Sequence, residues 1–203
     1  LKISNLYEEC RVKVKNFINA KHSSEVVFTS GTTASLNDIV FGYFKNKLKR
    51  GDEVIISEAE HAANVLPWFV LAKENGIIVK YVELSSNNEV TMDNLKKIIT
   101  SNTKVVSLAH ITNVVGDIRP IKEITEYAHR LGIKVLIDGA QSVPHLKIDV
   151  IDLDIDFLVF SGHKMCGPTG VGVLYGRYDL LNKIMPQKVG GGMNESYKEG
   201  SIY

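Results

Sequence analysis

Short, nearly solid apolar runs alternate with longer segments of helical periodicity along almost all of the 203 residues. Such runs indicate strands that are buried on both faces, and helices between them allow successive strands to lie parallel. The pattern predicts one α/β domain over residues 1–203, a three-layer α/β/α arrangement around a mostly parallel sheet. The expected strands are residues 25–29, 53–57, 77–84, 104–109, 134–138, 156–161 and 170–175, and the expected helices are residues 3–18, 34–48, 62–75, 91–100 and 120–131.

Composition excludes several classes of protein. Hydrophobic residues make up 44% of the chain, which is enough to bury a core. Lys and Arg number 24 against 23 Asp and Glu, so the net charge of +1 argues against a nucleic-acid partner bound through a basic surface. No apolar run approaches the roughly 20 residues that cross a bilayer, so we expect no membrane span.

The two cysteines, Cys10 and Cys166, are too few and too far apart for a disulfide framework or a zinc site. We expect two buried thiols in the reducing cytoplasm, with Cys10 at a core position of the first helix. Four aspartates between residues 149 and 156 resemble a cation site, but they lack the other ligands of a calcium loop. We expect a solvated acidic loop there and no metal.

Polar residues cluster where the predicted strands end. In parallel sheets, ligands bind beyond the carboxyl ends of the strands, so these side chains are the candidates for a functional site. They are Ser30, Thr32, Thr33, His61, Asn113, Asp138, Gln141, Ser161, His163 and Lys164.

The turn Ser30–Thr33 precedes a predicted helix. Successive N–H groups at a helix N-terminus, joined by threonine hydroxyls, can bind an anion. The same residues are also ordinary helix caps, and this reading is the better one for the turn taken alone.

Asp138 and Lys164 each follow a buried strand. An unpaired carboxylate there is costly, so Asp138 needs a donor or a cation, unless it only caps the next turn. Lys164 is either a solvated surface lysine or an amine held for chemistry. Together they fit pyridoxal 5'-phosphate (PLP), which needs a lysine for its Schiff base, a carboxylate at its ring nitrogen and a phosphate site. His61 can cover the ring, and Gln141 can donate to its phenolate oxygen.

Five motifs carry a resemblance to a known family. They are SGTT (30–33), EHAANVLPW (60–68), DGAQS (138–142), FSGHK (160–164) and GPTGVGVLYG (167–176). They resemble the class V aminotransferases of PLP fold type I, most closely the Suf-type cysteine desulfurase and selenocysteine lyase branch. The resemblance covers nearly the whole chain and implies the large domain of the aspartate aminotransferase-like PLP-dependent transferases.

The resemblance implies a role for each candidate. Lys164 is the Schiff-base lysine, Asp138 pairs with the pyridinium nitrogen and Gln141 with the phenolate oxygen. His61 stacks on the ring and acts in proton transfer, and Asn113 lies near the ring and the substrate carboxylate. Thr32, Thr33, Ser161 and His163 hold the phosphate. Gly190–Gly192 approach the site of a neighbouring subunit, since the family forms homodimers.

The implied activity is conversion of L-cysteine to L-alanine, with an enzyme persulfide passed to a sulfur-acceptor protein, as in iron–sulfur cluster assembly. Ala62 departs from the family, in which many members carry a second histidine. The family's persulfide cysteine, its substrate-carboxylate arginine and its small domain lie beyond Tyr203, so we expect this chain to be an inactive large-domain fragment. Alternatives are a selenocysteine lyase, an aminotransferase or a non-catalytic PLP-binding domain.

Overall fold

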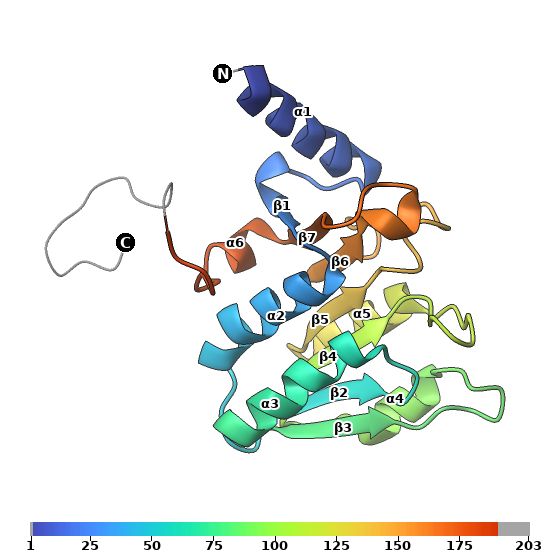
Figure 1. Cartoon of the computed structure of the whole chain (residues 1–203). Helices are drawn as coiled ribbons and strands as arrows, with labels where there is room; N and C mark the ends of the chain where they lie inside the picture. Colours follow the sequence, from blue (N-terminus) through green and yellow to red (C-terminus); the bar gives the residue numbers. More distant parts are fainter. Residues whose placement is uncertain (1, 191–203) are drawn as a thin grey trace, which may run out of the picture.

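The computed structural model describes residues 2–190, in which seven strands form a single sheet between helices (Figure 1). The strands are β1 (Val26–Thr29), β2 (Glu53–Ser57), β3 (Ile78–Val82), β4 (Thr103–Ala109), β5 (Lys134–Asp138), β6 (Phe157–Ser161) and β7 (Gly172–Gly176). The α-helices are α1 (Lys2–Phe17), α2 (Thr32–Gly42), α3 (Leu66–Asn75), α4 (Met92–Ile98), α5 (Ile121–Arg130) and α6 (Tyr178–Leu181). The 3₁₀ turns are η1 (Ser23–Glu25), η2 (Phe44–Asn46), η3 (Ala62–Asn64) and η4 (Gly162–Met165).

The α/β prediction is confirmed, and each expected strand is present within a few residues of its predicted bounds. Two expected helices are partly replaced by a 3₁₀ turn. The segment 34–48 leaves the α-helix after Gly42 and continues as the turn η2. The segment 62–75 begins as the turn η3, and α3 starts only at Leu66, next to Pro67, whose missing N–H suits the first turn of a helix.

The strand order is β1-β7-β6-β5-β4-β2-β3, and β7 runs antiparallel to both of its neighbours. The four pairs from β6 to β3 are parallel. Because β1 is antiparallel to β7, it points the same way as β6. The carboxyl ends of β1, β2, β4, β5 and β6 therefore meet at one edge of the sheet, which is called the carboxyl edge below.

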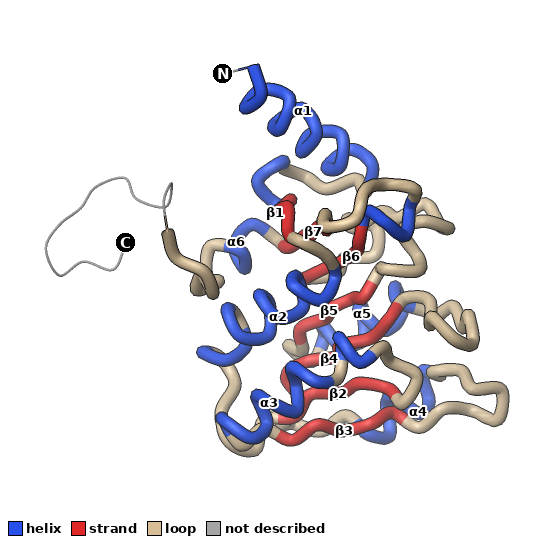
Figure 2. The backbone as a smooth tube through the Cα atoms, viewed as in Figure 1, coloured by secondary structure: helices blue, strands red, loops and turns tan. Residues whose placement is uncertain are grey.

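Each face of the sheet has its own core, and the backbone path in Figure 2 shows the helices on either side. On one face, Leu36 and Ile39 of α2 and Trp68 of α3 pack on alternate residues of the central strands. On the other face, Leu95 of α4 and Ile124 of α5 pack on the residues in between. This alternation explains why the strands are apolar throughout. Within residues 2–190, no helix combines the length and the apolar character needed to cross a bilayer.

The first helix lies beside the β1 edge, and none of its described residues is buried. The expectation of buried thiols is therefore wrong for Cys10, which is exposed. It is wrong for Cys166 as well, because that residue lies in an exposed turn after η4 with a left-handed backbone (φ +62°). Helical periodicity predicts an apolar stripe, and Ile3, Leu6 and Phe17 form one here, but nothing within residues 2–190 buries it.

Two glycines allow the turn after β1 to approach β7. Gly31 has φ +153°, a conformation that side chains disfavour, and it precedes the first residue of α2. A Cβ on Gly172 would lie 2.4 Å from the Cα of Gly31. Both positions therefore need glycine to bring the N-terminus of α2 against the sheet.

Candidate active site

A small pocket opens at the carboxyl edge of the sheet, between the ends of β2, β4, β5 and β6. It brings together five of the residues expected from the sequence. Its lining is His61, Ala109, Ile111, Asn113, Asp138, Ala140, Gln141 and Lys164. Segments more than 100 residues apart in the chain thus supply an imidazole, two amides, a carboxylate and an amine to one space.

Asp138 is the last residue of β5 and is only 4% exposed. Its Oδ1 accepts the backbone N–H of Ala140 at 2.9 Å, so the capping role considered above is real. The pKa of the Asp138 carboxyl is raised to about 6, chiefly by burial and also by the negative charge of Glu60, and the Ala140 N–H and Lys164 oppose the rise. A cation beside this carboxylate would offset the desolvation that raises its pKa. Asp138 therefore has the character of a residue that binds a positively charged group.

Lys164 comes from the turn η4, three residues beyond the end of β6, and is exposed at the mouth of the pocket. A flexible amine at this position can reach a ligand on the open side, with Asp138 at the buried side. The arrangement suits a ligand that carries both an electrophilic carbonyl and a basic nitrogen.

His61 follows β2 and caps the turn η3. Its Nδ1 accepts the backbone N–H of Ala63 at 3.1 Å. An accepting Nδ1 places the proton of the neutral ring on Nε2, so a donor remains free toward the pocket. Ala62, where many family members carry histidine, is exposed beside it.

Asn113 and Gln141 complete the pocket from two different loops. Asn113 is exposed in the loop after β4, and Gln141 is half-buried three residues after Asp138. Both side chains offer amide donors and acceptors, which suit neutral or anionic oxygens of a ligand.

The expected anion-binding residues lie at the N-terminus of α2. Ser161 Oγ, from the end of β6, accepts the backbone N–H of Thr32 at 2.8 Å and lies 2.7 Å from Thr32 Oγ1. Thr33 and His163 are the exposed neighbours of this pair along the chain. The first turn of an 11-residue helix with two hydroxyls at its N-terminus is a suitable site for a phosphate group.

A buried ion pair next to the pocket was not anticipated from the sequence. The carboxylate of Glu60 bonds to the guanidinium of Arg119, and both side chains are 0% exposed. Glu60 Oε2 also accepts from Asn64 Nδ2 and from Ala109 N, each at 2.8 Å. Glu60 stands in one of the motifs quoted above, but a carboxylate in a loop is usually solvated, and only the tertiary structure shows its partner.

His110 is a second unanticipated neighbour of the pocket. Its backbone N–H donates to the Asp138 carbonyl at 2.9 Å, and its side chain is buried with Nδ1 unpartnered among the described residues. Burial lowers the pKa of His110 to about 4, so the ring is neutral near pH 7. It therefore adds no charge beside Asp138.

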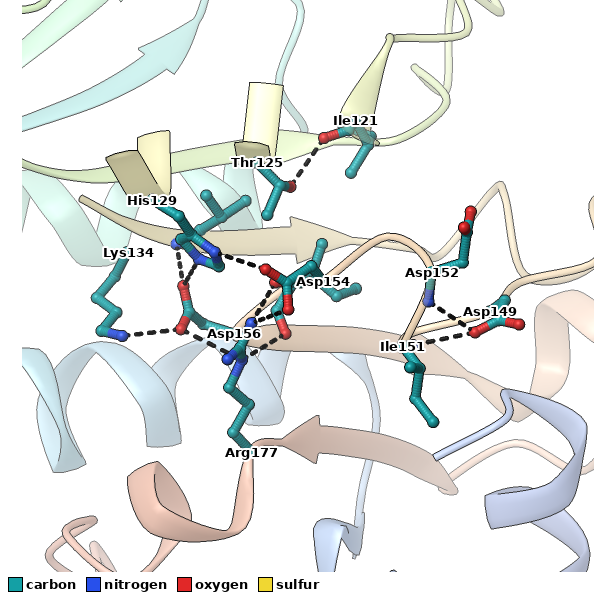
Figure 3. Close-up of polar contacts among 12 residues, drawn as sticks. Ile121, Thr125, His129, Lys134, Asp149, Ile151, Asp152, Asp154, Asp156 and Arg177 are labelled. Carbon is teal, nitrogen blue, oxygen red and sulfur yellow. Dashed lines mark hydrogen bonds and ion pairs between the residues drawn. The ribbon is translucent and has the colours of Figure 1, made fainter. Parts of the chain in front are cut away.

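The aspartates between residues 149 and 156 lie at the opposite edge of the sheet, and they are not all solvated as expected (Figure 3). Asp156 is fully buried. It accepts from His129 Nε2 at 2.8 Å, from Lys134 Nζ at 2.9 Å and from Val135 N at 2.8 Å. These contacts fix the start of β6, and within residues 2–190 no cluster of His, Cys, Asp or Glu suits a metal ion. The expectation was wrong for Asp156 because its partners lie on other elements.

A larger cavity, of about 750 Å³, lies away from this pocket, between β1, α2 and the segment 184–188. Its lining is mostly apolar, including Phe28, Phe41 and Met185, with Asp38 and Lys188 at its edge. It lacks the amine, imidazole and buried carboxylate that the smaller pocket brings together. The smaller pocket is therefore the better candidate for chemistry.

Comparison with known proteins adds to this geometry. A family model described as Aminotransferase class-V matches residues 1–202. The chain belongs to the class-V aminotransferase family. The resemblance drawn from the five motifs is thereby confirmed, and Gly190–Gly192, expected near a neighbouring subunit, lie almost wholly outside the described residues.

Family members with similar sequences are named as desulfurases. A probable cysteine desulfurase of Halalkalibacterium halodurans is 46% identical over 187 residues, covering 92% of this chain and 46% of the relative. A cysteine desulfurase of Synechococcus elongatus is 46% identical over 190 residues, covering 94% of this chain and 30% of the relative. The chain thus spans half or less of the length of these curated family members.

Solved structures of the family share the fold. The cysteine desulfurase CsdA of Escherichia coli has a TM-score of 0.93 at 38% identity, covering 97% of this chain and 49% of CsdA. The cysteine desulfurase of Thermococcus onnurineus has a TM-score of 0.89 at 37% identity, covering 95% of this chain and 48% of that one. A solved structure of a C-DES mutant, with a TM-score of 0.85 at 26% identity, covering 93% of this chain and 50% of that one, is described with glycine covalently linked to its PLP cofactor.

Proposed function

We propose that this chain forms the PLP-binding half of a cysteine desulfurase, an enzyme that converts L-cysteine to L-alanine and passes the sulfur to an acceptor. One observation carries the proposal: a single pocket holds the amine of Lys164 and the buried carboxylate of Asp138, 26 residues apart in the chain. The names of the family members in the comparisons support cysteine as the substrate.

The residues of the pocket fit PLP group by group. The raised pKa and single described hydrogen bond of Asp138 suit pairing with a protonated ring nitrogen. Lys164 is the amine for the aldehyde carbon, and Gln141 suits the phenolate oxygen. His61 lies on the open side, where a flat ring can cover another ring. Thr32, Thr33, Ser161 and His163 form the phosphate site at the N-terminus of α2.

When bound, PLP supplies an electron sink for the bonds of a substrate α-carbon. Asp138, shielded from water at the end of β5, keeps the proton on the ring nitrogen in place. Lys164, on a short turn, can carry a proton to or from the substrate α-carbon. His61, with Nδ1 accepting from Ala63, can donate or accept a proton through Nε2. Asn113 orients the substrate carboxylate.

The persulfide cysteine and the arginine for the substrate carboxylate belong, on this proposal, to a part of the enzyme that these 203 residues do not include. Cys166 is not that cysteine on our proposal, since it lies beyond the lysine in a left-handed turn. We also propose a homodimer, a cytoplasmic location, a sulfur-acceptor protein as partner and a role in iron–sulfur cluster assembly. L-selenocysteine is the alternative substrate.

The test is covalent capture of PLP. The purified chain, with PLP added, should gain a visible absorbance band, and borohydride should fix the cofactor to a peptide containing Lys164 by mass spectrometry. Lys164→Ala should abolish the label. Lys183→Ala, which replaces an exposed lysine just after α6, should retain it. Labelling spread over surface lysines, or unchanged in Lys164→Ala, would contradict the proposal. Desulfurase activity would then be measured on a longer chain with a thiol reductant present, which releases the persulfide sulfur as sulfide, and with alanine as the other product.

A further inference from the structure

We propose that Glu60 and Arg119 are positioning residues, a buried ion pair that holds the two loops carrying His61 and Asn113 at the mouth of the pocket. The functional meaning of this pair rests on the proposed function, because the pair lies beside the proposed PLP site. The structural part of it can be tested without cofactor or substrate.

The two residues stand at the base of the two loops. Glu60 directly precedes His61 in the loop after β2, and Arg119 ends the loop that follows β4 and carries Asn113. The two loops face each other across a groove lined by residues 58–62 and 112–115. The contact between Glu60 and Arg119 therefore joins the loops beneath their exposed tips.

The first loop is tied down almost entirely through Glu60. Its two oxygens accept from Ser57 Oγ at 2.7 Å, from Asn64 Nδ2 and Ala109 N at 2.8 Å each, and from Arg119. Asn64 Oδ1 in turn accepts from Ser107 Oγ at 2.6 Å. Asn64 ends the turn η3, whose N-cap is His61. The carboxylate thus fixes both sides of the histidine, against β2 on one side and β4 on the other.

The second loop is fixed at its base and free at its tip. Arg119 donates to Ser57 Oγ at 2.6 Å and to the Ala109 carbonyl at 3.2 Å, and its Nε lies 3.6 Å from Asp117 Oδ2. Its own N–H donates to the His110 carbonyl at 3.0 Å. Within the loop, Thr112 N–H donates to the Asp117 carbonyl at 3.1 Å and Thr112 Oγ1 accepts from Asp117 N at 3.0 Å, while Val114 at the tip is 87% exposed. These bonds close the loop that carries Asn113, and Arg119 anchors its base to β2 and β4.

The buried charges of Glu60 and Arg119 also neutralise each other. An unpaired charge at a site with no exposure is strongly unfavourable, so removal of either partner disturbs the groups around the other. Removal of both charges avoids that penalty. The two loops should therefore loosen in each single variant and recover in a double variant, which independent packing contributions would not produce.

The test uses hydrogen–deuterium exchange on the cofactor-free chain. The variants are Arg119→Met, Arg119→Lys, Glu60→Gln and the double variant E60Q/R119M. The control is Lys80→Gln, which breaks an ion pair to Glu53 (3.1 Å) at the far edge of the sheet. Arg119→Lys keeps the charge without the planar fork, and it covers the case in which Arg119→Met does not fold.

Each single variant should raise exchange in residues 58–64 and 111–118 at least several-fold, and leave β5 and α5 unchanged. The ring signal of His61 in NMR, assigned with His61→Asn, should shift in the single variants and return toward its original position in the double variant. Lys80→Gln should do neither. Unchanged loops, exchange raised uniformly as in a general loss of stability, or strictly additive effects in the double variant would overturn the proposal.

The outcome is separable from that of the proposed function. If the wild-type chain does not capture PLP while the loops respond as described, the function proposed above fails and the positioning pair stands. If PLP is captured at Lys164 and the loops do not respond, the positioning role alone is wrong.

Discussion

Ser161 Oγ, at the end of β6, accepts the backbone N–H of Thr32, the first residue of α2, at 2.8 Å. The two residues are 129 positions apart, and Gly31, the N-cap of this helix, has no side chain to take that role. A strand therefore caps a helix from another part of the chain. The same hydroxyl belongs to the proposed phosphate site, so it serves stability and binding together.

Replacement of Ser161 separates these two roles. Ser161→Ala removes the acceptor for Thr32 N–H and should cost about 1–2 kcal/mol of unfolding free energy, as other lost caps do. It should also weaken PLP binding, followed by absorbance titration. Thr91→Ala is the matched control, because Thr91 Oγ1 caps α4 by accepting from Asn94 N at 3.2 Å, away from the pocket. Equal PLP affinity in both variants would contradict the phosphate role of Ser161.

The buried carboxylate of Asp138 should lower the stability of the cofactor-free fold while it favours PLP binding. Its pKa is raised from 3.8 to about 6 by burial, so the cofactor-free fold is most stable, as far as this group is concerned, below about pH 4. That contribution is lost as the pH rises through 6 and the buried carboxyl ionises. Asp138→Asn should therefore stabilise the cofactor-free chain at pH 7.5 by about 2–3 kcal/mol and have little effect at pH 4.

Urea unfolding at the two pH values measures this difference, and PLP capture by the same variant should fall. Asp152→Asn, at an exposed carboxylate paired with Lys122, is the control and should change neither quantity. An Asp138→Asn chain that is less stable than the wild type at pH 7.5 would show that burial of the ionised carboxylate does not destabilise the fold.

His129, at the far edge of the sheet, should give a pH dependence of the same sign as Asp138, but at higher pH. Its hydrogen bond to buried Asp156 raises the pKa of the imidazole above 6.5, and Asp154 at 3.0 Å acts in the same direction (Figure 3). The stabilisation by protonated His129 is complete below the unfolded pKa near 6.5, and it is lost as the pH rises through the folded pKa.

His129→Gln should therefore lower the free energy of unfolding by about 1.5–3 kcal/mol at pH 5.5, the range for a hydrogen bond to a charged group, and by less at pH 9. Thermal unfolding at the two pH values measures this. A deficit that grows toward alkaline pH would contradict the assignment. Asp156→Asn, with His129 kept, should reduce this pH dependence, because Asp156 is the main partner of His129 and Asp154 then remains as the other.

A single methyl group added at Gly172 should destabilise the fold. An alanine Cβ there would lie 2.4 Å from the Cα of Gly31, so the turn before α2 must move. Overpacking of this kind typically costs about 1–3 kcal/mol, and we expect Gly172→Ala to weaken PLP capture as well. Gly190→Ala, where no atom of the described residues lies within 4 Å of the added carbon, is the control for the loss of stability. Denaturant unfolding and borohydride labelling of both variants check the prediction.

Local patterns predicted the strands because apolar runs such as residues 135–137 are most stable in the middle of a sheet. They also predicted the pocket, since Asp138 ends one such run and Lys164 lies three residues beyond another. Periodicity failed for Cys10, because a helical stripe shows that a face is apolar and not what covers it. Burial of Asp156 and the pair Glu60–Arg119 depend on partners 21 to 59 residues away, which no local pattern specifies.

The place of β1 at the edge of the sheet has a consequence for biosynthesis. Its ladder partner β7 is made about 145 residues later, as Val26 pairs with Tyr175. The segment from β2 to β6 can pair strand by strand while the ribosome is still at work, but β1, which leads into the turn at Gly31, has no strand to pair with until β7 has emerged. A nascent chain halted before Gly172 would therefore carry Lys164 and Asp138 and still lack an ordered cradle for a phosphate.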